Sequence, residues 1–366
     1  MSFHEFLGNE RIVSALRGML RRDRVPSALL FTGPRGIGKY TLARMFAQAA
    51  NCERLKDDFC GECASCLRLA PFVDPAPLID AGLSERGDSA DAAAVERTPL
   101  ILETHPDVWL IVPDPVRLRN PVARPMIRVG QLRAVQRAAY FKPQGRRRVF
   151  ILDGADTMRW TDADVFLKIL EEPPESATLI LLAPTPDSLL RTIRSRCLQF
   201  HFAPVPVPQI ASFLNDRTSW NPAEQKLAAQ LACGSPGLAL SLDLQESARL
   251  RMSILRLVEQ AVAGQKYGEI FAATAQLAKQ EKESFENILE LLYSLFTDLL
   301  ESSQGTLGSL PRNPDLLREV QTLARSIDLD WVSRATQRLD VLANGLRRNI
   351  SRQLALDALV ASLAVR

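Results

Sequence analysis

The sequence predicts an α/β protein in which a parallel β-sheet, covered by helices on both faces, is followed by two helical regions. Three short and largely apolar runs, at 28–33, 149–152 and 179–182, alternate with helix-like segments. Strands that are apolar throughout are typical of parallel sheets buried on both faces. Beyond residue 241 the apolar residues recur at helical spacing instead. The chain therefore begins as α/β and ends as all-α.

The length of the chain predicts more than one domain. Its 366 residues exceed what a single hydrophobic core usually holds, about 250 to 300 residues. The proline-rich segment 203–208 marks a boundary, because proline disfavours both helix interiors and central strands. We therefore expect a phosphate-loop domain at 1–203 with a metal module at 52–66, a small helical domain at 204–242, and a second helical domain at 243–366.

Two apolar stripes predict long helices in the last domain. The first stripe is Phe285, Ile288, Leu289, Leu292, Phe296, Leu299 and Leu300, and the second is Leu339, Leu342, Leu346, Ile350, Leu354 and Ala358. Spacings of three and four place such residues on one helix face. By contrast, residues 71–104 are rich in Ala, Asp and Pro with weak periodicity, and a long loop is the simplest prediction there.

The composition favours a cytoplasmic globular protein. Apolar residues make up 46% of the chain and charged residues 24%, with a formal net charge of +3. We find neither a signal-like start nor about 18 consecutive apolar residues, so secretion and membrane spanning are not expected. The mild positive charge permits contact with nucleic acid without requiring it.

The segment Gly33–Lys39 has the pattern of a phosphate-binding loop. It follows an apolar strand and precedes a predicted helix at 38–50. In such loops backbone amides and the helix N-terminus surround phosphates, and the lysine reaches the outer ones. We therefore expect Gly33, Gly36, Gly38 and Lys39 to form a nucleotide-type site, together with Asp153 after the second strand.

This site lacks two groups that hydrolysis requires. Tyr40 stands where Ser or Thr would offer magnesium a hydroxyl, and Thr41 is rotated away by about 100 degrees. Gly154 follows Asp153 where a carboxylate could orient the attacking water. Asp156 is better placed to cap a helix than to act as a base. We expect weak or absent ATP binding and no intrinsic hydrolysis.

Four cysteines predict a structural metal site. Cys52, Cys60, Cys63 and Cys66 have a C-x7-C-x2-C-x2-C spacing that can enclose one tetrahedral Zn²⁺, and four protein ligands leave no position for a catalytic water. Gly61 gives the chain freedom to turn around the metal. Cys197 and Cys233 lie outside this pattern and are expected to be small core residues.

Several motifs in order resemble the subunits of bacterial DNA polymerase III clamp loaders, which are AAA+ proteins. They are the phosphate loop, the four cysteines, His105-Pro106-Asp107, Leu170-Glu171-Glu172-Pro173-Pro174 and Thr192-Ile193-Arg194-Ser195-Arg196-Cys197. The similarity runs from about residue 5 to residue 240. It continues weakly through Asn349, Arg352, Leu354 and Asp357, in a region similar to the family's helical collar. The helical region at 204–242 would then be the lid.

The resemblance favours the noncatalytic, stator-like branch of this family, the delta-prime type. Besides Tyr40 and Gly154, Ala183-Pro184 stands near where motor subunits carry a polar phosphate sensor, and Gly234–Ala239 matches the second sensor motif without its arginine. The implied partners are the gamma/tau motor subunits and the delta subunit in a hetero-pentameric ring, with the sliding clamp and primed DNA reached through the complex. As part of the holoenzyme the chain would serve a DNA-directed DNA polymerase, a nucleotidyltransferase.

One catalytic residue is implied by the same resemblance. Ser195-Arg196-Cys197 is similar to the motif through which one subunit inserts an arginine into its neighbour's ATP site. Residues 198–202 have the pattern of a strand, which puts Arg196 in the loop entering it. The alternative for Arg196 is a salt bridge within its own domain. Arg194 is the nearest other arginine, and it could face solvent or pair with Asp187.

Two other functions stay open. The chain could be an ATP-hydrolysing gamma/tau-like motor subunit with an unusual magnesium site. It could also be a zinc-dependent nucleic-acid binding protein on a phosphate-loop scaffold, for which Arg128, Arg133 and Arg137 are the best evidence. Salt-dependent DNA binding by the isolated chain would favour the last.

Overall fold

A computed structural model describes residues 2–86, 92–114, 125–159, 163–264, 267–278, 285–305, 311–345 and 351–363. The chain separates into two compact units. The first is Met1–Gln209 with Gly234–Leu238, and the second is Ile210–Cys233 with Ala239–Arg366. The further division of the helical part at residue 242 stays a prediction.

A six-stranded sheet of order β2-β3-β4-β5-β1-β6 forms the centre of the first unit. The strands are β1 Ala28–Thr32, β2 Leu102–His105, β3 Val108–Ile111, β4 Arg148–Leu152, β5 Ala177–Ala183 and β6 Leu198–His201. All neighbouring strands are parallel except β2, which pairs antiparallel with β3. The expected parallel sheet is confirmed, with one antiparallel strand at its edge.

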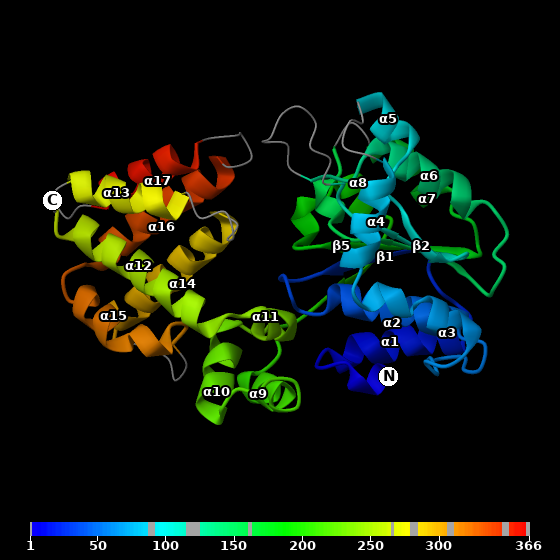
Figure 1. The fold of residues 1–366 in the computed structure, drawn as a ribbon, viewed down its shortest axis with the longest axis horizontal. Coiled ribbons are helices and arrows are strands. Elements are labelled where there is room, and N and C mark those ends of the chain that lie inside the picture. Colours follow the sequence, from blue (N-terminus) through cyan, green and yellow to red (C-terminus); the bar gives the residue numbers. More distant parts are fainter. Residues whose placement is uncertain are drawn as a thin grey trace. The chain divides into compact units, whose positions relative to one another are not determined.

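Helices cover both faces of this sheet, with α1 and α2 on one side and α6 and α7 on the other (Figure 1). The helices are α1 Glu10–Arg21, α2 Lys39–Asn51, α3 Ala64–Arg68, α4 Ala76–Arg86, α5 Ala92–Arg97, α6 Val129–Ala139, α7 Ala163–Glu171 and α8 Arg191–Arg194. Every residue of β1, β4 and β5 is buried. This two-sided burial explains why those strands are mostly apolar, with Thr32, Arg148 and Thr178 as buried polar exceptions.

The expected loop at 71–104 is wrong, because the segment contains η2 Ala70–Val73, α4, α5 and the start of β2. Alanine has the highest helix propensity, and the Asp74 carboxylate accepts a hydrogen bond of 3.1 Å from the Ala76 N–H. An ion pair of 2.8 Å between Arg86 and Asp114, whose side chains are 6% and 0% exposed, ties α4 to the segment that follows β3. A buried polar pair of this kind leaves no periodic pattern in the sequence. Residues 87–91 lie outside the described part.

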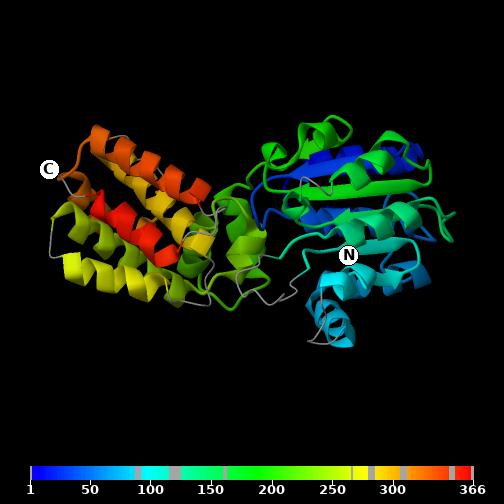
Figure 2. The same ribbon diagram turned by 90° about the horizontal axis from the view of Figure 1, so that it is seen from above.

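The second unit consists of helices, several of which lie side by side (Figure 2). They are α9 Val207–Asn215, α10 Pro222–Leu231, α11 Pro236–Ser241, α12 Leu244–Val262, α13 Tyr267–Ala278, α14 Phe285–Ser303, α15 Leu317–Ala324, α16 Leu329–Gly345 and α17 Arg352–Ala361; α9 and α11 begin in the first unit. The first predicted stripe lies on α14. Six of its seven residues are buried, and Leu300 packs against them.

The second predicted stripe is wrong in its later half. Leu339 and Leu342 are buried on α16, but α16 ends at Gly345 and α17 begins at Arg352. On α17 the buried face is Leu356, Leu359 and Val360, whereas Leu354 and Ala358 are exposed. Ser351, directly before α17, has a non-helical ψ of 122°, so the helical spacing does not continue into α17. Leu346, Asn349 and Ile350 lie outside the described residues.

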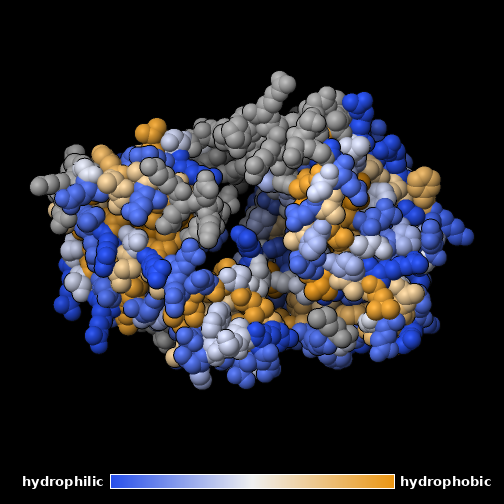
Figure 3. All heavy atoms as spheres, in the orientation of Figure 1, coloured by the Kyte–Doolittle hydropathy of each residue, from blue (hydrophilic) through white to orange (hydrophobic). Residues whose placement is uncertain are grey.

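Hydrophilic side chains cover much of both units on the face drawn in Figure 3, with small groups of apolar side chains between them. Among the described residues, none of the helices combines the length and the hydrophobicity that crossing a bilayer needs.

Candidate functional site

The phosphate loop lies where parallel strands end. Gly33 follows β1, and its N–H donates a 3.0 Å hydrogen bond to the Pro184 carbonyl after β5, so Ala183-Pro184 lies beside the loop. Gly36 and Gly38 have φ of +75° and +101°, a conformation that glycine adopts without steric cost. A Cβ on Gly36 would also lie 2.6 Å from the Leu238 nitrogen. These glycines are therefore required by the loop.

The charges of Lys39 and Asp153 influence each other, and their pairing in a nucleotide site stays a prediction. The Lys39 ammonium donates to the carbonyls of Gly33 at 2.6 Å and Pro34 at 2.9 Å. Burial lowers the pKa of Lys39, and the charges of Asp153 and Asp156 oppose that shift. Burial likewise raises the pKa of Asp153, and Lys39 opposes it. The two charges thus stabilise each other at the carboxyl edge of the sheet.

Tyr40 points its hydroxyl at another part of the chain. The phenol donates a 2.6 Å hydrogen bond to the carbonyl of Phe72 in η2, and burial raises its pKa above the ordinary value. The hydroxyl therefore ties α2 to the segment that follows the cysteines. Thr41, the next hydroxyl, is exposed.

Both the backbone conformation of Gly154 and its surroundings disfavour any side chain at this position. Its φ is +72°, and a Cβ would lie 2.9 Å from Cγ of the Pro113 ring. A glutamate at this position would be strained and would collide with a rigid ring. Asp156 is not the expected cap, because it lies inside η3 Ala155–Thr157, whose N-cap is Gly154.

The segment that carries the sensor-like motif contacts the phosphate loop through backbone atoms. The Gly237 N–H donates a 2.8 Å hydrogen bond to the Gly36 carbonyl. A Cβ on Gly237 would lie 2.9 Å from that same oxygen. Two glycines thus allow this close approach within the first unit.

The four predicted cysteines form one cluster. Their Sγ atoms all lie within 4.8 Å of one another, and tetrahedral Zn–S bonds of about 2.3 Å would put them about 3.8 Å apart. The Cys52 and Cys60 sulfurs accept backbone N–H groups from Leu55 and Cys63, as ligand sulfurs do in outer-shell networks. Gly61 has a φ of +75°, as the turn requires. The donor set fits a tetrahedral thiophilic metal.

The thiols of the cluster differ in acidity. Backbone N–H groups, that of Glu62 first, lower the pKa of Cys60 to about 6. Burial raises the pKa of Cys66 above its ordinary value. Outside the cluster, burial raises the pKa of Cys197 to about 12, as expected for a thiol in an apolar environment. Cys233, expected in the core, is exposed by surface area.

Two polar networks that the sequence analysis did not predict hold the cysteine module. Ser65 contacts the His105 ring at 2.9 Å, and Asp107 accepts the N–H groups of Gln144 and Gly145. The His105-Pro106-Asp107 motif, which forms the β2–β3 turn, therefore links the module to the segment before β4. The motif could be recognised in the sequence, but the residues that it contacts lie far from it along the chain.

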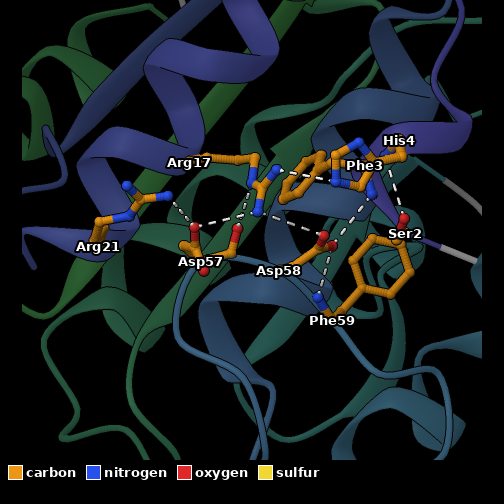
Figure 4. A network of polar contacts seen from close by, with 8 residues as sticks. All are labelled: Ser2, Phe3, His4, Arg17, Arg21, Asp57, Asp58 and Phe59. Atoms are coloured by element: carbon orange, nitrogen blue, oxygen red, sulfur yellow. Dashed lines mark hydrogen bonds and ion pairs between the residues drawn. The ribbon is translucent and has the colours of Figure 1, made fainter.

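The second network lies just before Cys60 (Figure 4). Asp57 binds Arg21 at 2.7 Å and Arg17 at 3.3 Å, both on α1. Asp58 accepts the Phe3 N–H at 3.2 Å, and the rings of Phe3 and Phe59 meet edge to face. The N-terminal segment and α1 are thus fixed to the module.

Arg196 lies in the turn entering β6, which is an edge strand of the sheet. Its Nη2 is 2.8 Å from Glu171 Oε1, and its Nη1 donates to the Thr192 carbonyl at 2.9 Å. The Arg196 side chain is 36% exposed. Arg194 pairs with Asp187, one of the two alternatives expected for it. Arg196 therefore forms an ion pair within its own unit while remaining accessible.

Comparison with known proteins decides the family. Residues 8–206, more than half of the chain, match the family described as DNA polymerase III, delta subunit. The chain belongs to this family. Its curated relatives include DNA polymerase III subunit tau of Escherichia coli strain K12, 30% identical over 249 residues that make up 66% of this chain and 32% of that protein. Subunit gamma/tau of Mycobacterium bovis is 32% identical over 206 residues, 56% of this chain and 29% of that protein.

The chain thus spans about a third or less of the length of these relatives. Among solved structures, a gamma subunit-related protein of Thermotoga maritima aligns with 96% of this chain and 98% of its own, at 16% identity and a TM-score of 0.40. A RuvB mutant of the same organism aligns with 86% of this chain and 90% of its own, at 16% identity and a TM-score of 0.40. These values are too low to add to the assignment.

Proposed function

We propose that the chain is a noncatalytic, delta-prime-type subunit of the bacterial clamp loader. It joins the gamma/tau motor subunits and the delta subunit in a ring that loads the sliding clamp on primed DNA. Its own nucleotide site binds ATP weakly or not at all, and Arg196 acts on ATP held by a neighbouring motor subunit. The resident cofactor is one structural Zn²⁺.

The backbone conformation and the surroundings of Gly154 are the main support for a noncatalytic role. A residue with a water-orienting carboxylate fits there only if the backbone φ changes and Pro113 moves away. Tyr40, at the position of the magnesium hydroxyl, donates its O–H to Phe72 instead. Hydrolysis needs both the metal and an oriented water. Tyr40 and Gly154 thus oppose hydrolysis independently of each other, and the obstacle at Gly154 lies in the backbone.

The exposure of Arg196 supports a role in trans. An arginine supplied by a neighbour can contribute about 10³ to 10⁵ in rate to phosphoryl transfer, and its planar fork can bind two phosphate oxygens at once. The ion pair with Glu171 is exposed on both sides, 36% and 49%, and such pairs contribute little to stability. The guanidinium can therefore be recruited by a phosphate at small cost.

Zinc is supported by the four thiol donors and their mutual distances. Cys52, Cys60, Cys63 and Cys66 would hold it, and the metal would supply a fixed crosslink between the end of α2 and α3. The Asp57 and Asp58 contacts would carry that rigidity to α1 and the N-terminal segment.

An ATP-hydrolysing motor subunit is the second candidate, favoured by one observation: the relatives named above are tau and gamma/tau subunits. In that case Lys39 and Asp153 would serve a working site. The test is phosphate release by the purified chain with ATP and Mg²⁺. We expect negligible turnover, equal to that of Lys39→Ala. Turnover typical of ATPases, abolished by Lys39→Ala, would establish the motor role instead.

A further inference from the structure

Glu171 and Arg196 come from separate segments that meet at the surface of the first unit. Glu171 is the last residue of α7, and Arg196 follows α8 by two residues. The Glu171 carboxylate binds Nη2 and the Thr192 carbonyl binds Nη1. One contact on each terminal nitrogen fixes the plane of the guanidinium as well as its position.

These two contacts leave the arginine able to bind a further group. A guanidinium carries five N–H donors, and the contacts with Glu171 and Thr192 use two of them. A phosphate oxygen can therefore be bound by remaining donors while both anchors persist. The neighbouring Arg194 is held by a single carboxylate, that of Asp187, which is 87% exposed.

Stability does not account for the Glu171 contact. Both side chains are more than a third exposed, and exposed ion pairs contribute little to folding because water screens them. Their effect on geometry is larger. A free arginine side chain loses substantial rotamer entropy when it is fixed, and a reacting group held in place beforehand avoids that loss at the moment of reaction.

We propose that Glu171 is a positioning residue for Arg196, holding the guanidinium in the orientation in which it reaches ATP bound to a neighbouring subunit. This inference rests on the proposed role of Arg196 in trans. Orientation comes from the hydrogen-bond acceptor, so the negative charge of Glu171 is not required. Glutamine, which keeps an acceptor oxygen at the same reach, should substitute for it, whereas alanine should not.

The experiment reconstitutes the loader with unmodified motor subunits and varies this chain alone. The quantity of interest is the part of DNA-stimulated ATP hydrolysis that Arg196→Ala removes. Glu171→Ala should reduce this part about threefold to tenfold through kcat, with the KM for ATP and assembly on a sizing column unchanged. Glu171→Gln should stay within about twofold of the unmodified chain. Glu172→Ala, the adjacent exposed glutamate, is the matched control and should change nothing.

The outcomes separate this inference from the proposed function. If Arg196→Ala lowers hydrolysis and Glu171→Ala does not, the positioning role is wrong and the trans role stands. A rise in hydrolysis with Glu171→Ala would mean that Glu171 restrains the arginine, which also overturns the inference. So would loss of assembly in both Glu171 variants, since the residue would then be structural. If Arg196→Ala itself has no effect, the proposed function fails and the inference with it.

Discussion

The Tyr40 hydroxyl donates a 2.6 Å hydrogen bond to the carbonyl of Phe72. Tyr40 lies in the first turn of the helix after the phosphate loop, and Phe72 lies six residues beyond the last cysteine of the cluster. The position that would hold magnesium in an active site thus serves here to tie α2 to the segment that follows the cysteine module.

This connection predicts a loss of stability when the hydroxyl is removed. Tyr40→Phe leaves the ring in place and deletes the bond to a partly buried carbonyl, which should lower the free energy of unfolding by about 1 kcal/mol. Tyr140→Phe is the control, because its hydroxyl bonds the Glu172 carbonyl at the surface at 3.1 Å and its loss should cost less. Urea unfolding measures both. Equal effects would mean that the Tyr40 bond contributes nothing specific.

The backbone at Gly154 predicts that the active-site glutamate cannot simply be restored. Gly154→Ala should destabilise the chain by about 2 to 4 kcal/mol in urea unfolding, because it adds the cost of a positive φ to an overlap with Pro113. Gly264→Ala is matched, since Gly264 has a φ of +64° and its Cβ would meet nothing within 4 Å among the described residues; it should cost about 1 kcal/mol. A Gly154 effect no larger than the Gly264 effect would show that the Pro113 contact yields easily.

The backbone at Gly154 should also prevent ATP hydrolysis from being restored by side-chain replacement. The double variant Tyr40→Thr with Gly154→Glu restores both missing side chains and should still release phosphate no faster than the unmodified chain. Hydrolysis in that variant, abolished by Lys39→Ala, would show that the backbone at Gly154 is not the obstacle.

The buried pair of Arg86 and Asp114 predicts that α4 is part of the folded unit. Arg86→Met leaves the fully buried Asp114 carboxylate without this cation and should lower the free energy of unfolding by about 3 kcal/mol. The control is Arg54→Met, whose ion pair with Glu62 is 59% and 75% exposed; it should change stability by less than about 0.5 kcal/mol. An Arg86 effect as small as the control would mean that α4 is not docked through this pair.

The cysteine cluster predicts one zinc per chain. Metal analysis of protein purified without chelator should find a one-to-one ratio, and Cys63→Ser should lose the metal and destabilise the chain, because structural zinc contributes directly to folding. Cys233→Ser, outside the cluster, should keep the full metal content. Metal-free protein from a chelator-free purification would contradict the zinc site.

The sequence predicted the parts of the fold whose signal is local. The strands of the sheet centre, α2 and the stripe on α14 follow from apolar runs and helical spacing, and the cysteine cluster follows from spacing alone. What it missed depends on pairs distant in sequence: Arg86 with Asp114, Asp57 with Arg21, and Ser65 with His105. The non-helical Ser351 before α17 was missed because apolar residues happened to continue the spacing past it.

The site shows the same division. The sequence could predict that Lys39 and Asp153 share one edge, because each follows a strand, and β1 and β4 do belong to one parallel sheet. The contact of Gly154 with Pro113 could not be predicted, since a glycine in a sequence does not reveal what a side chain would meet there. Likewise a salt bridge of Arg196 within its own domain was only an alternative to its role in trans, with no partner named, and Glu171 emerges as that partner only in three dimensions.

The central claim is that this chain acts on its neighbour's ATP through Arg196, and one measurement tests it most directly. The loader is reconstituted with unmodified motor subunits and either Arg196→Ala or Arg194→Ala in this chain, and DNA-stimulated ATP hydrolysis and clamp loading are compared. Arg196→Ala should assemble normally and lose the hydrolysis that depends on this chain, by at least about 10²-fold at the affected site, whereas Arg194→Ala should retain it. Normal assembly of the Arg196→Ala loader with unchanged hydrolysis and clamp loading would contradict the claim.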